Sequence, residues 1–427
     1  MKAPIRWFVA AALGSGGGHA ALAAQTPAED RLRVFIDCNY CDMDFLRTEI
    51  GWIDHMRDRA DAHVHVLVTR QQTGAGGNEY TLEFIGLRQF TGRSDTLKHV
   101  ATADATQDIV RQGLARVIKL GLVPFLAQTP QGRLIDVIVA AQPASATTPA
   151  TPQKDPWNFW NFRIGMNTSM DGESQANFGY FSGNVTANRT TERWKLNVTV
   201  NGSYFESNFK LDSITWTKAV RRSYSASALL VKSLGGHFSA GARANLGTST
   251  FGNTSLSVSL APAVEYNFVP YAESTRRQFR VQYAAGVRHY NYRELTIFNQ
   301  IEESRPFHNF VMGYFTRQPW GSINISLDVS QFLHDTGKYN AGVSGTTEFR
   351  LFRGFSFNLT GGYNRIRDQI TLAARDPTDQ EVLLRQRQLA TGYRYFAFGG
   401  ISYRFGSIFN NVVNPRFASM GGFFFIE

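Results

Sequence analysis

From residue 157 onward, apolar and polar side chains alternate along the chain with a period of two. Near residue 358, for example, Phe355, Phe357 and Leu359 alternate with serine, asparagine and threonine. Such alternation is typical of β-strands with one apolar and one polar face. The pattern predicts twelve strands, at residues 157–171, 174–190, 192–208, 214–233, 236–249, 254–269, 276–292, 305–318, 320–334, 340–353, 354–369 and 389–406.

The connections between these segments alternate in length. Short turns such as Arg353-Gly354 fall on one side of the predicted sheet, and the longer loops 293–304 and 370–388 fall on the other. An even strand number with this asymmetry is typical of a barrel that spans an outer membrane. The sequence therefore predicts a twelve-stranded antiparallel transmembrane β-barrel. A soluble β-sandwich is the alternative, but its strands are usually shorter than roughly 14–18 residues.

Before residue 141 the pattern changes to alternating strands and helices. The order predicts a small α/β domain of the type β-α-β-β-α-β. Its predicted elements are a strand at 33–38, a helix carrying Leu46, Ile50 and Ile53, a hairpin around 64–84, a helix after Asp104 and a strand at 134–140.

Residues 1–24 have the features of an export signal. Lys2 and Arg6 precede a short apolar stretch, and Ala21-Leu22-Ala23 offers a cleavage site with small residues. Residues 141–156 are rich in proline, alanine and threonine, which predicts an extended linker. The expected organisation is a signal peptide at 1–24, a periplasmic α/β domain at 25–140, a linker at 141–156, an outer-membrane β-barrel at 157–406 and a C-terminal tail at 407–427.

Composition agrees with a barrel. The 427 residues include 33 Phe, 16 Tyr and 38 Gly, yet the chain lacks the long apolar run that a membrane-spanning helix needs. The formal net charge is +10. The basic excess lies within the predicted barrel, so we assign it to interior, loop and rim residues and expect no nucleic acid as a partner.

The strand parity predicts which charged residues face the barrel interior, because a charge on the lipid face is costly. The interior is expected to be basic. This favours an anion-favouring pore or an anionic ligand site, since basic rings attract anions. The alternative is a filled interior in which the charges pair with one another. The basic set is Arg163, Lys195, Arg243, Arg280, Arg288, Arg350, Arg394 and Arg404, and the acidic set is Glu265, Asp328 and Glu348.

Cys38 and Cys41 are the only cysteines of the chain. A pair at this spacing after a strand superficially resembles a thioredoxin-type redox site. That family places a proline loop opposite its cysteines, whereas this chain has no proline between residues 28 and 123. Nearby carboxylates, Asp37 among them, also disfavour a reactive thiolate. We therefore expect a structural disulfide in an oxidising compartment.

Other candidate sites are weaker. His63 and His65 share one strand face but lack further metal ligands, so a solvated strand face is expected. The glycine-rich run from Gly74 to Gly77 lacks the lysine of a phosphate-binding loop and predicts a hairpin turn. Neither His237 nor His289 shows a nucleophile, base and orienting group in sequence. We expect no enzymatic activity, no metal site and no cofactor.

The strand end FGGISYRF, at residues 398–405, resembles the Gly-x-x-aromatic-x-aromatic signal that the barrel assembly machinery recognises. Gly400, Tyr403 and Phe405 carry this resemblance, and a tail follows them. The stretches VFIDCNYCDMDFLRTEI, MRDRADAHVHVLVT, EYTLEFIGL and YRFGSIFNNVVNPRF are similar to a family of uncharacterised bacterial outer-membrane β-barrel proteins with an N-terminal periplasmic α/β module. The resemblance implies this fold and location, but no activity.

Three functions fit these features. The first is a channel that favours anions. The second is a membrane-anchored scaffold or assembly protein whose α/β domain binds a periplasmic protein or the cell wall. The third is an outer-membrane enzyme that modifies lipid. In each case the expected partners are outer-membrane lipid and the barrel assembly machinery, and the expected location is the outer membrane with the α/β domain in the periplasm.

Overall fold

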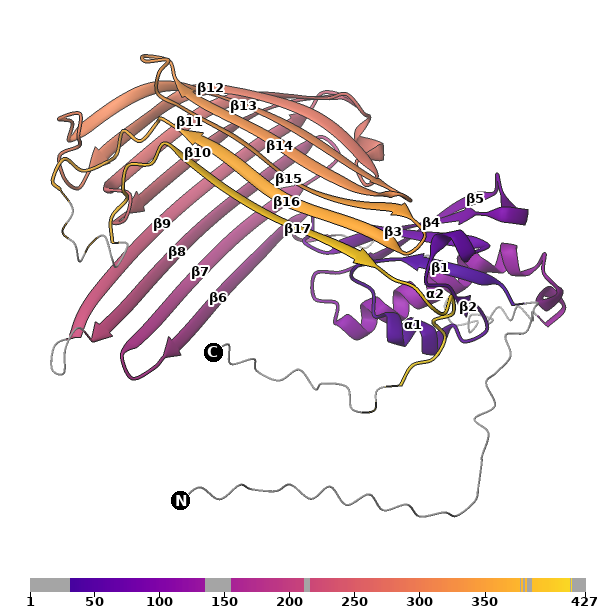
Figure 1. The fold of residues 1–427 in the computed structure, drawn as a ribbon. Helices are drawn as coiled ribbons and strands as arrows, with labels where there is room; N and C mark the ends of the chain where they lie inside the picture. The colour runs from indigo at the N-terminus through magenta and orange to yellow at the C-terminus, as the bar shows by residue number, and fades with distance from the viewer. Residues whose placement is uncertain are drawn as a thin grey trace, which may run out of the picture.

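The computed structural model describes residues 31–134, 155–210, 216–376, 378, 381, 386–414 and 416. The predicted signal peptide and nearly all of the predicted linker lie outside these residues. The described chain forms a small α/β domain and a large curved β-sheet, and the domain lies against one end of the sheet (Figure 1).

The α/β domain contains a five-stranded sheet in the order β2-β1-β3-β4-β5. β1 runs parallel to β2 and β3, whereas β3, β4 and β5 form an antiparallel meander. Its strands and helices are β1 (Arg33–Asp37), α1 (Met43–Glu49), β2 (Asp54–His55), β3 (Val64–Gln72), β4 (Asn78–Gly86), β5 (Ser94–Ala101) and α2 (Gln107–Leu126), with short 3₁₀ turns at Arg59–Asp61, Arg88–Phe90 and Pro130–Leu134.

The structure adds two strands to the predicted order of this domain. β2 has two residues, and β5 is mostly exposed, so neither carries an apolar alternation that sequence reasoning could detect. Helix α2 begins after Thr106, whose side chain accepts a hydrogen bond from the Ile109 backbone N–H. Leu134 ends a 3₁₀ turn, and the rest of the strand predicted at 134–140 falls outside the described residues.

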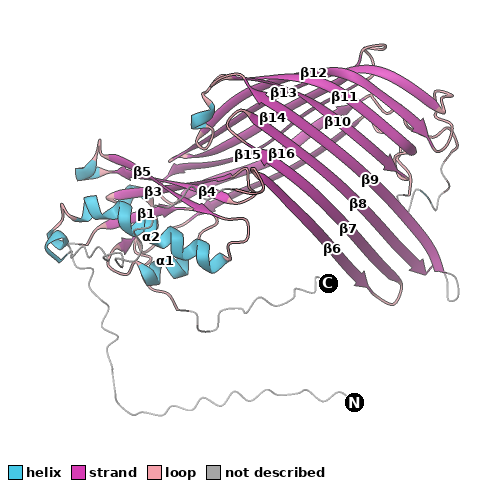
Figure 2. Ribbon diagram, turned by 180° about the vertical axis from the view of Figure 1, so that it is seen from behind, coloured by secondary structure: helices cyan, strands magenta, loops and turns pink. Residues whose placement is uncertain are grey.

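Both helices pack on the sheet face that points away from the large sheet (Figure 2). Val64, Val66 and Val68 project from β3 into the core with α2 side chains such as Ile118. All six residues from Val64 to Thr69 are nevertheless buried. Because side chains alternate across a strand, the opposite face of this small sheet must also be covered.

The large sheet has twelve strands in simple sequential order from β6 to β17, and every neighbouring pair is antiparallel. This confirms the predicted number and order of strands. They are β6 (Trp160–Gly172), β7 (Ala176–Thr190), β8 (Trp194–Lys210), β9 (Trp216–Ser233), β10 (Phe238–Ser249), β11 (Thr254–Asn267), β12 (Arg277–Tyr292), β13 (Glu302–Gln318), β14 (Gly321–Phe332), β15 (Tyr339–Phe352), β16 (Phe355–Ile366) and β17 (Tyr393–Tyr403).

β6 and β17 are the edges of this curved sheet. They run in opposite directions, and no ladder joins them among the described residues. The tight turns, such as Arg353-Gly354, lie at the end next to the α/β domain, and the long connection from β16 to β17 lies at the other end. Within the described part of the chain, none of the helices is both long and apolar enough to cross a bilayer.

Candidate functional site

The twelve-stranded sheet has two chemically different faces. Residues directly opposite each other in an antiparallel ladder project from the same face, so the register assigns every side chain to one of them. One face carries exposed apolar residues such as Ile164, Leu260 and Ile401, which are 79%, 60% and 73% exposed. The other face carries serine, asparagine, threonine and the charged residues that the alternation singled out.

The register places all eleven predicted charged residues on this polar face. Arg288 pairs with Ser259, Glu265 with Gln282, and Asp328 with Val311 across successive ladders. Continued through every ladder, the same face holds Arg163, Lys195, Arg243, Arg280, Arg350, Arg394, Arg404 and Glu348. The structure does not gather these residues into one cluster, because they are distributed over eight strands, with Arg404 directly after the last of them.

The polar face is the inner face of the curved sheet. Near the end remote from the α/β domain, Phe307 and Phe332 project from it and pack with Ile370 of the β16–β17 connection. That connection reaches the β11–β12 side, where the Asn253 amide donates to the Thr371 carbonyl over 3.1 Å. An isolated bridge also joins Ala373 to Thr296. The connection therefore lies across the inner face at this end.

The inner acidic residues bind side chains beside them, whereas most inner basic residues have no ion pair in the described part of the chain. Glu265 accepts hydrogen bonds from Tyr271 and Gln282, and Asp328 accepts from Asn309. Among the described residues, Arg350 is the only one of the eight predicted basic side chains with an ion pair. The described side chains of the inner face make no hydrogen bond or ion pair to one another across the interior.

Arg350 binds a residue that the strand pattern did not assign to this site. Its guanidinium donates two hydrogen bonds to the Asp37 carboxylate, one of them 2.8 Å long between Nη2 and Oδ1. Asp37 ends β1 of the α/β domain and is only 4% exposed. Burial alone would raise the pKa of Asp37, but hydrogen bonds from Arg350 and His65 outweigh burial and hold it well below its ordinary value. The ionised pair therefore fastens the domain to the sheet.

His65 lies beneath this pair, so the expectation of a solvated strand face is wrong for this residue. It is completely buried, with Nε2 3.3 Å from Asp37 Oδ2. Burial lowers the pKa of His65 despite the carboxylate beside it, which favours the neutral ring. The sequence could not reveal this burial, because the cover comes from residues almost 300 positions later. His63 instead accepts from the Arg33 N–H at 3.4 Å.

Further contacts fasten the domain around the end of the large sheet. Asp61 pairs with Arg353 at 2.9 Å, and Glu83 pairs with Arg276 at 2.9 Å. The Asp58 carboxylate accepts from the Gly354 N–H at 2.7 Å. These contacts reach the β15–β16 turn and the start of β12.

The hairpin of β3 and β4 reaches the first strands of the large sheet. Its glycine-rich turn is a hairpin turn, as its composition suggested. A Cβ on Gly74 would lie only 2.5 Å from the Cβ of Thr190, so the backbone can pass here because glycine has no side chain. Gly76, at a φ of +82°, lies next to Asn161. The domain therefore extends from the β6–β7 side to the β15–β16 side.

The chain after β17 returns to the α/β domain. Phe409 forms an antiparallel bridge with Met56, directly after β2. The Asn410 N–H donates to the His55 carbonyl at 2.8 Å, and the Asn411 amide donates to Asp54 at 2.9 Å. Part of the predicted tail thus extends the edge of the five-stranded sheet.

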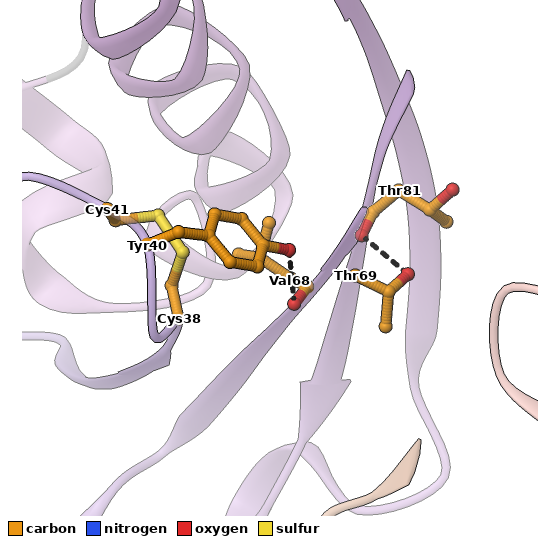
Figure 3. The surroundings of a disulfide bond; sticks show 6 residues. All are labelled: Cys38, Tyr40, Cys41, Val68, Thr69 and Thr81. Carbon is orange, nitrogen blue, oxygen red and sulfur yellow. Dashed lines mark hydrogen bonds between the residues drawn. A yellow bond between two sulfur atoms is a disulfide. The ribbon is translucent and has the colours of Figure 1, made fainter. Parts of the chain in front are cut away.

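The two cysteines form a disulfide immediately after Asp37 (Figure 3). Between them, Tyr40 donates a hydrogen bond from its hydroxyl to the Val68 carbonyl at 2.9 Å. Burial raises the pKa of Tyr40 to about 12, so the hydroxyl keeps its proton. The bridge holds the loop that follows Asp37 against β3, and this supports a structural role.

The structure places partners beside His289 that the local sequence did not show. Its Nδ1 lies 2.8 Å from the Ser304 hydroxyl, and its Nε2 lies 3.1 Å from the Asn291 side-chain oxygen. Ser304 lies directly opposite His289 in the β12–β13 ladder, 15 residues later in the sequence. By contrast, His237 binds the Asn267 carbonyl, and Ser239 binds Tyr271. No group of three potential metal ligands occurs among the residues described.

Comparison with known proteins gives remote structural likeness only. No protein-family model and no curated protein matches the chain. The NanC porin aligns with 57% of this chain and 99% of its own, at 9% identity and a TM-score of 0.29. The CymD monoaromatic hydrocarbon channel aligns with 57% of this chain and 85% of its own, at 6% identity and a TM-score of 0.22. CdiB from Acinetobacter baumannii aligns with 88% of this chain and 74% of its own, at 8% identity and a TM-score of 0.27. At these TM-scores the likeness identifies neither a family nor an activity.

Proposed function

We propose that the chain is an outer-membrane β-barrel that conducts small anions and whose periplasmic mouth is covered by its own α/β domain. In this proposal β6 and β17 pair in the membrane and close the sheet. Their antiparallel directions and the even strand number support closure. The exposed apolar face, with residues such as Ile164 and Leu260, is the surface that contacts lipid.

The composition of the inner face supports an open, anion-favouring interior. Small polar residues dominate it, as in β14, where Ser322, Asn324, Ser326 and Ser330 point inward. Seven of the eight predicted basic side chains have no ion pair in the described part of the chain. Unpaired guanidinium groups in a water-filled interior attract anions and repel cations.

The single observation that supports a covered mouth is the buried Asp37–Arg350 pair. Arg350 projects from the inner face, so its partner must enter the mouth of the barrel to reach it. The sheet face that carries Asp37 and His65 is buried there. We infer that the domain restricts passage from the periplasmic side, and that opening requires it to tilt or leave.

Reconstitution of the full chain in a planar bilayer tests this proposal. Under a salt gradient, the reversal potential should show anion preference, and full conductance should be infrequent while the domain is docked. Replacing Arg243 and Arg280 with glutamate should reduce or reverse this preference, because both point inward. Arg193→Glu is the matched control, since Arg193 lies in an exposed turn. Absence of conductance, or a cation preference, contradicts the proposal.

In this proposal residues 1–24 act as the export signal. The barrel assembly machinery recognises the strand end through Gly400, Tyr403 and Phe405. The scaffold alternative uses the same topology, but the domain would bind a periplasmic protein or the cell wall through its helical face. Crosslinking in cells separates the two functions. A scaffold should give a specific product from exposed helix positions such as Arg116, whereas a channel needs none.

A lipid hydrolase is the second candidate, favoured by the Ser304–His289–Asn291 chain of hydrogen bonds. A serine, a base and an orienting amide are the groups of a nucleophilic site. They lie on the apolar face, where an ester of a membrane lipid could reach the serine. Purified protein should then release fatty acid from phospholipid vesicles, and Ser304→Ala should abolish release. Equal, background release by both proteins excludes this candidate.

A further inference from the structure

A cavity of about 590 Å³ lies between the α/β domain and the rim of the twelve-stranded sheet. The domain provides one wall through the 3₁₀ turn after β2 and the loop after β4, and the ends of β15, β16 and β17 provide the other. Arginine is the common feature of both walls. The lining guanidinium groups belong to Arg57, Arg59, Arg88, Arg350, Arg353 and Arg404.

The acidic residues near the cavity do not balance this charge. Asp58 and Glu348 are the only carboxylates in the lining. Arg350 and Arg353 are already paired with residues of the domain. The other four arginines have no carboxylate within ion-pairing distance in the described part of the chain. Their positive charge therefore has no ion-pair partner among the described residues.

Two of these arginines also hold unused hydrogen-bond donors. The Nε atoms of Arg57 and Arg59 are buried and find no acceptor among the described atoms. Buried donors are normally satisfied, so the described protein atoms leave these two donors free. Arg88 is held in the left-handed region, at a φ of +53°, while its Nη2 donates to the Ala60 carbonyl at 2.7 Å. The backbone thus fixes a third guanidinium at the cavity.

The remaining wall is aromatic and continues onto the outer face of the sheet. Phe352 and Phe355 stack with centroids 4.7 Å apart, and Trp320 stacks on Phe349 at 5.7 Å. Phe352 and Tyr403 are 62% and 59% exposed. In a membrane barrel, aromatic residues near the end of the strands form a belt at the level where lipid headgroups meet water.

We infer that this cavity binds the phosphate headgroup of an anionic phospholipid from the adjacent leaflet. The inference rests on the proposed membrane setting. Arginine forks match phosphate oxygens with two parallel hydrogen bonds, and the aromatic wall accommodates the start of the acyl chains. A free phosphate ion would use the same guanidinium groups but would leave the aromatic wall exposed. The bound lipid would then bridge the domain and the barrel rim.

Native mass spectrometry of the full chain in detergent micelles tests this inference. We expect one phosphatidylglycerol to be retained, and phosphatidylcholine to bind about tenfold more weakly. The double variant R57Q/R59Q should lower phosphatidylglycerol affinity about tenfold, since it removes charge-assisted hydrogen bonds. The matched control, R116Q/R133Q, removes two exposed arginines of the same domain that do not line the cavity. It should bind lipid like the unmodified protein.

The single variant R404Q keeps the inference testable if the double variant misfolds. The Arg404 side chain is exposed and has no ion pair in the described part of the chain, so its replacement should not disturb the fold. It should weaken lipid binding while leaving the thermal transition unchanged. Equal retention of lipid by all variants overturns the inference. Inorganic phosphate that binds as tightly as phosphatidylglycerol, with the same dependence on Arg57 and Arg59, overturns the lipid source. If the protein conducts ions but shows no lipid preference, only the lipid inference is contradicted. If it binds lipid without conducting ions, only the proposed channel is contradicted.

Discussion

Asp37 and Arg350 are 313 residues apart in sequence, yet two guanidinium N–H groups of Arg350 donate to the Asp37 carboxylate. Removing one partner of such a buried pair typically costs about 3 kcal/mol, because the other charge stays buried alone. We expect Asp37→Arg to loosen the domain and increase the time that the reconstituted channel spends at full conductance. Single-channel recording measures this change.

The exchanged pair, Asp37→Arg with Arg350→Asp, provides the control. It restores opposite charges at the same two positions, so channel closure should return towards that of the unmodified protein. If Asp37→Arg and the exchanged pair behave alike, the ion pair does not hold the domain over the mouth.

The α/β domain should lose stability as the pH falls from about 6.5 towards 4. Burial lowers the pKa of His55 to about 4, so the unfolded chain takes up a proton on this ring before the folded chain does. Between pH 7.5 and pH 5 the expected loss from His55 is about 2 kcal/mol. Thermal unfolding at the two pH values measures it, and His55→Asn should reduce the dependence to the part that other buried histidines such as His65 contribute.

Asp37 contributes in the same direction but in a more acidic range. Its lowered pKa means that the stability from its charge is present above about pH 4 and is lost only in stronger acid. A loss of stability near pH 6 that His55→Asn leaves unchanged would contradict the assignment to His55.

The Cys38–Cys41 bridge should stabilise the domain without serving a redox cycle. Closing so short a loop is worth about 2 kcal/mol in the chain-entropy model. We expect Cys38→Ser with Cys41→Ser to lower the thermal transition of the α/β domain, and a reductant to do the same in the unmodified protein. A dithiol–disulfide exchange assay checks the second part, and measurable turnover would falsify the structural role.

Closure of the sheet predicts that β6 and β17 lie side by side in the membrane. Asn161 and Ser402 both project inward near the end next to the domain. We pair a cysteine at Asn161 with a cysteine at Ser402, or at Gly400 or Arg404, which lie on the same face as Ser402. At least one of these pairs should form a disulfide, since bridging needs Cβ atoms within about 4.5 Å. Non-reducing gels detect it. Asn161→Cys paired with Ser344→Cys, which lies two strands from β17 in the middle of β15, should stay unlinked.

The large sheet was predictable because each strand repeats one local rule. Alternation of residues such as Phe355 and Leu359 identifies the strand and its faces without reference to any distant residue. The same rule failed for β5, where exposed residues leave no apolar stripe. It also placed Arg350 on the inner face, but it could not identify Asp37 as its partner.

The site contacts lie beyond sequence reasoning for a physical reason. A lone histidine such as His65 looks the same whether water or protein covers it, and the covering residues belong to another part of the chain. The Ser304–His289 contact depends on strand register, which the length of the preceding loop sets. The sequence offered a faint signal at Gly74, where glycine permits the close approach to Thr190.

The tail contact has a consequence for how the chain is made. The edge of the five-stranded sheet next to β2 is completed by Phe409, Asn410 and Asn411, which leave the ribosome more than 350 residues after His55. A chain that stops before β17 therefore leaves that edge bare, and bare edges invite aggregation and proteolysis. Only a chain that has been made to its end can cover this edge of its first domain, so truncated chains should be cleaved more readily than complete ones.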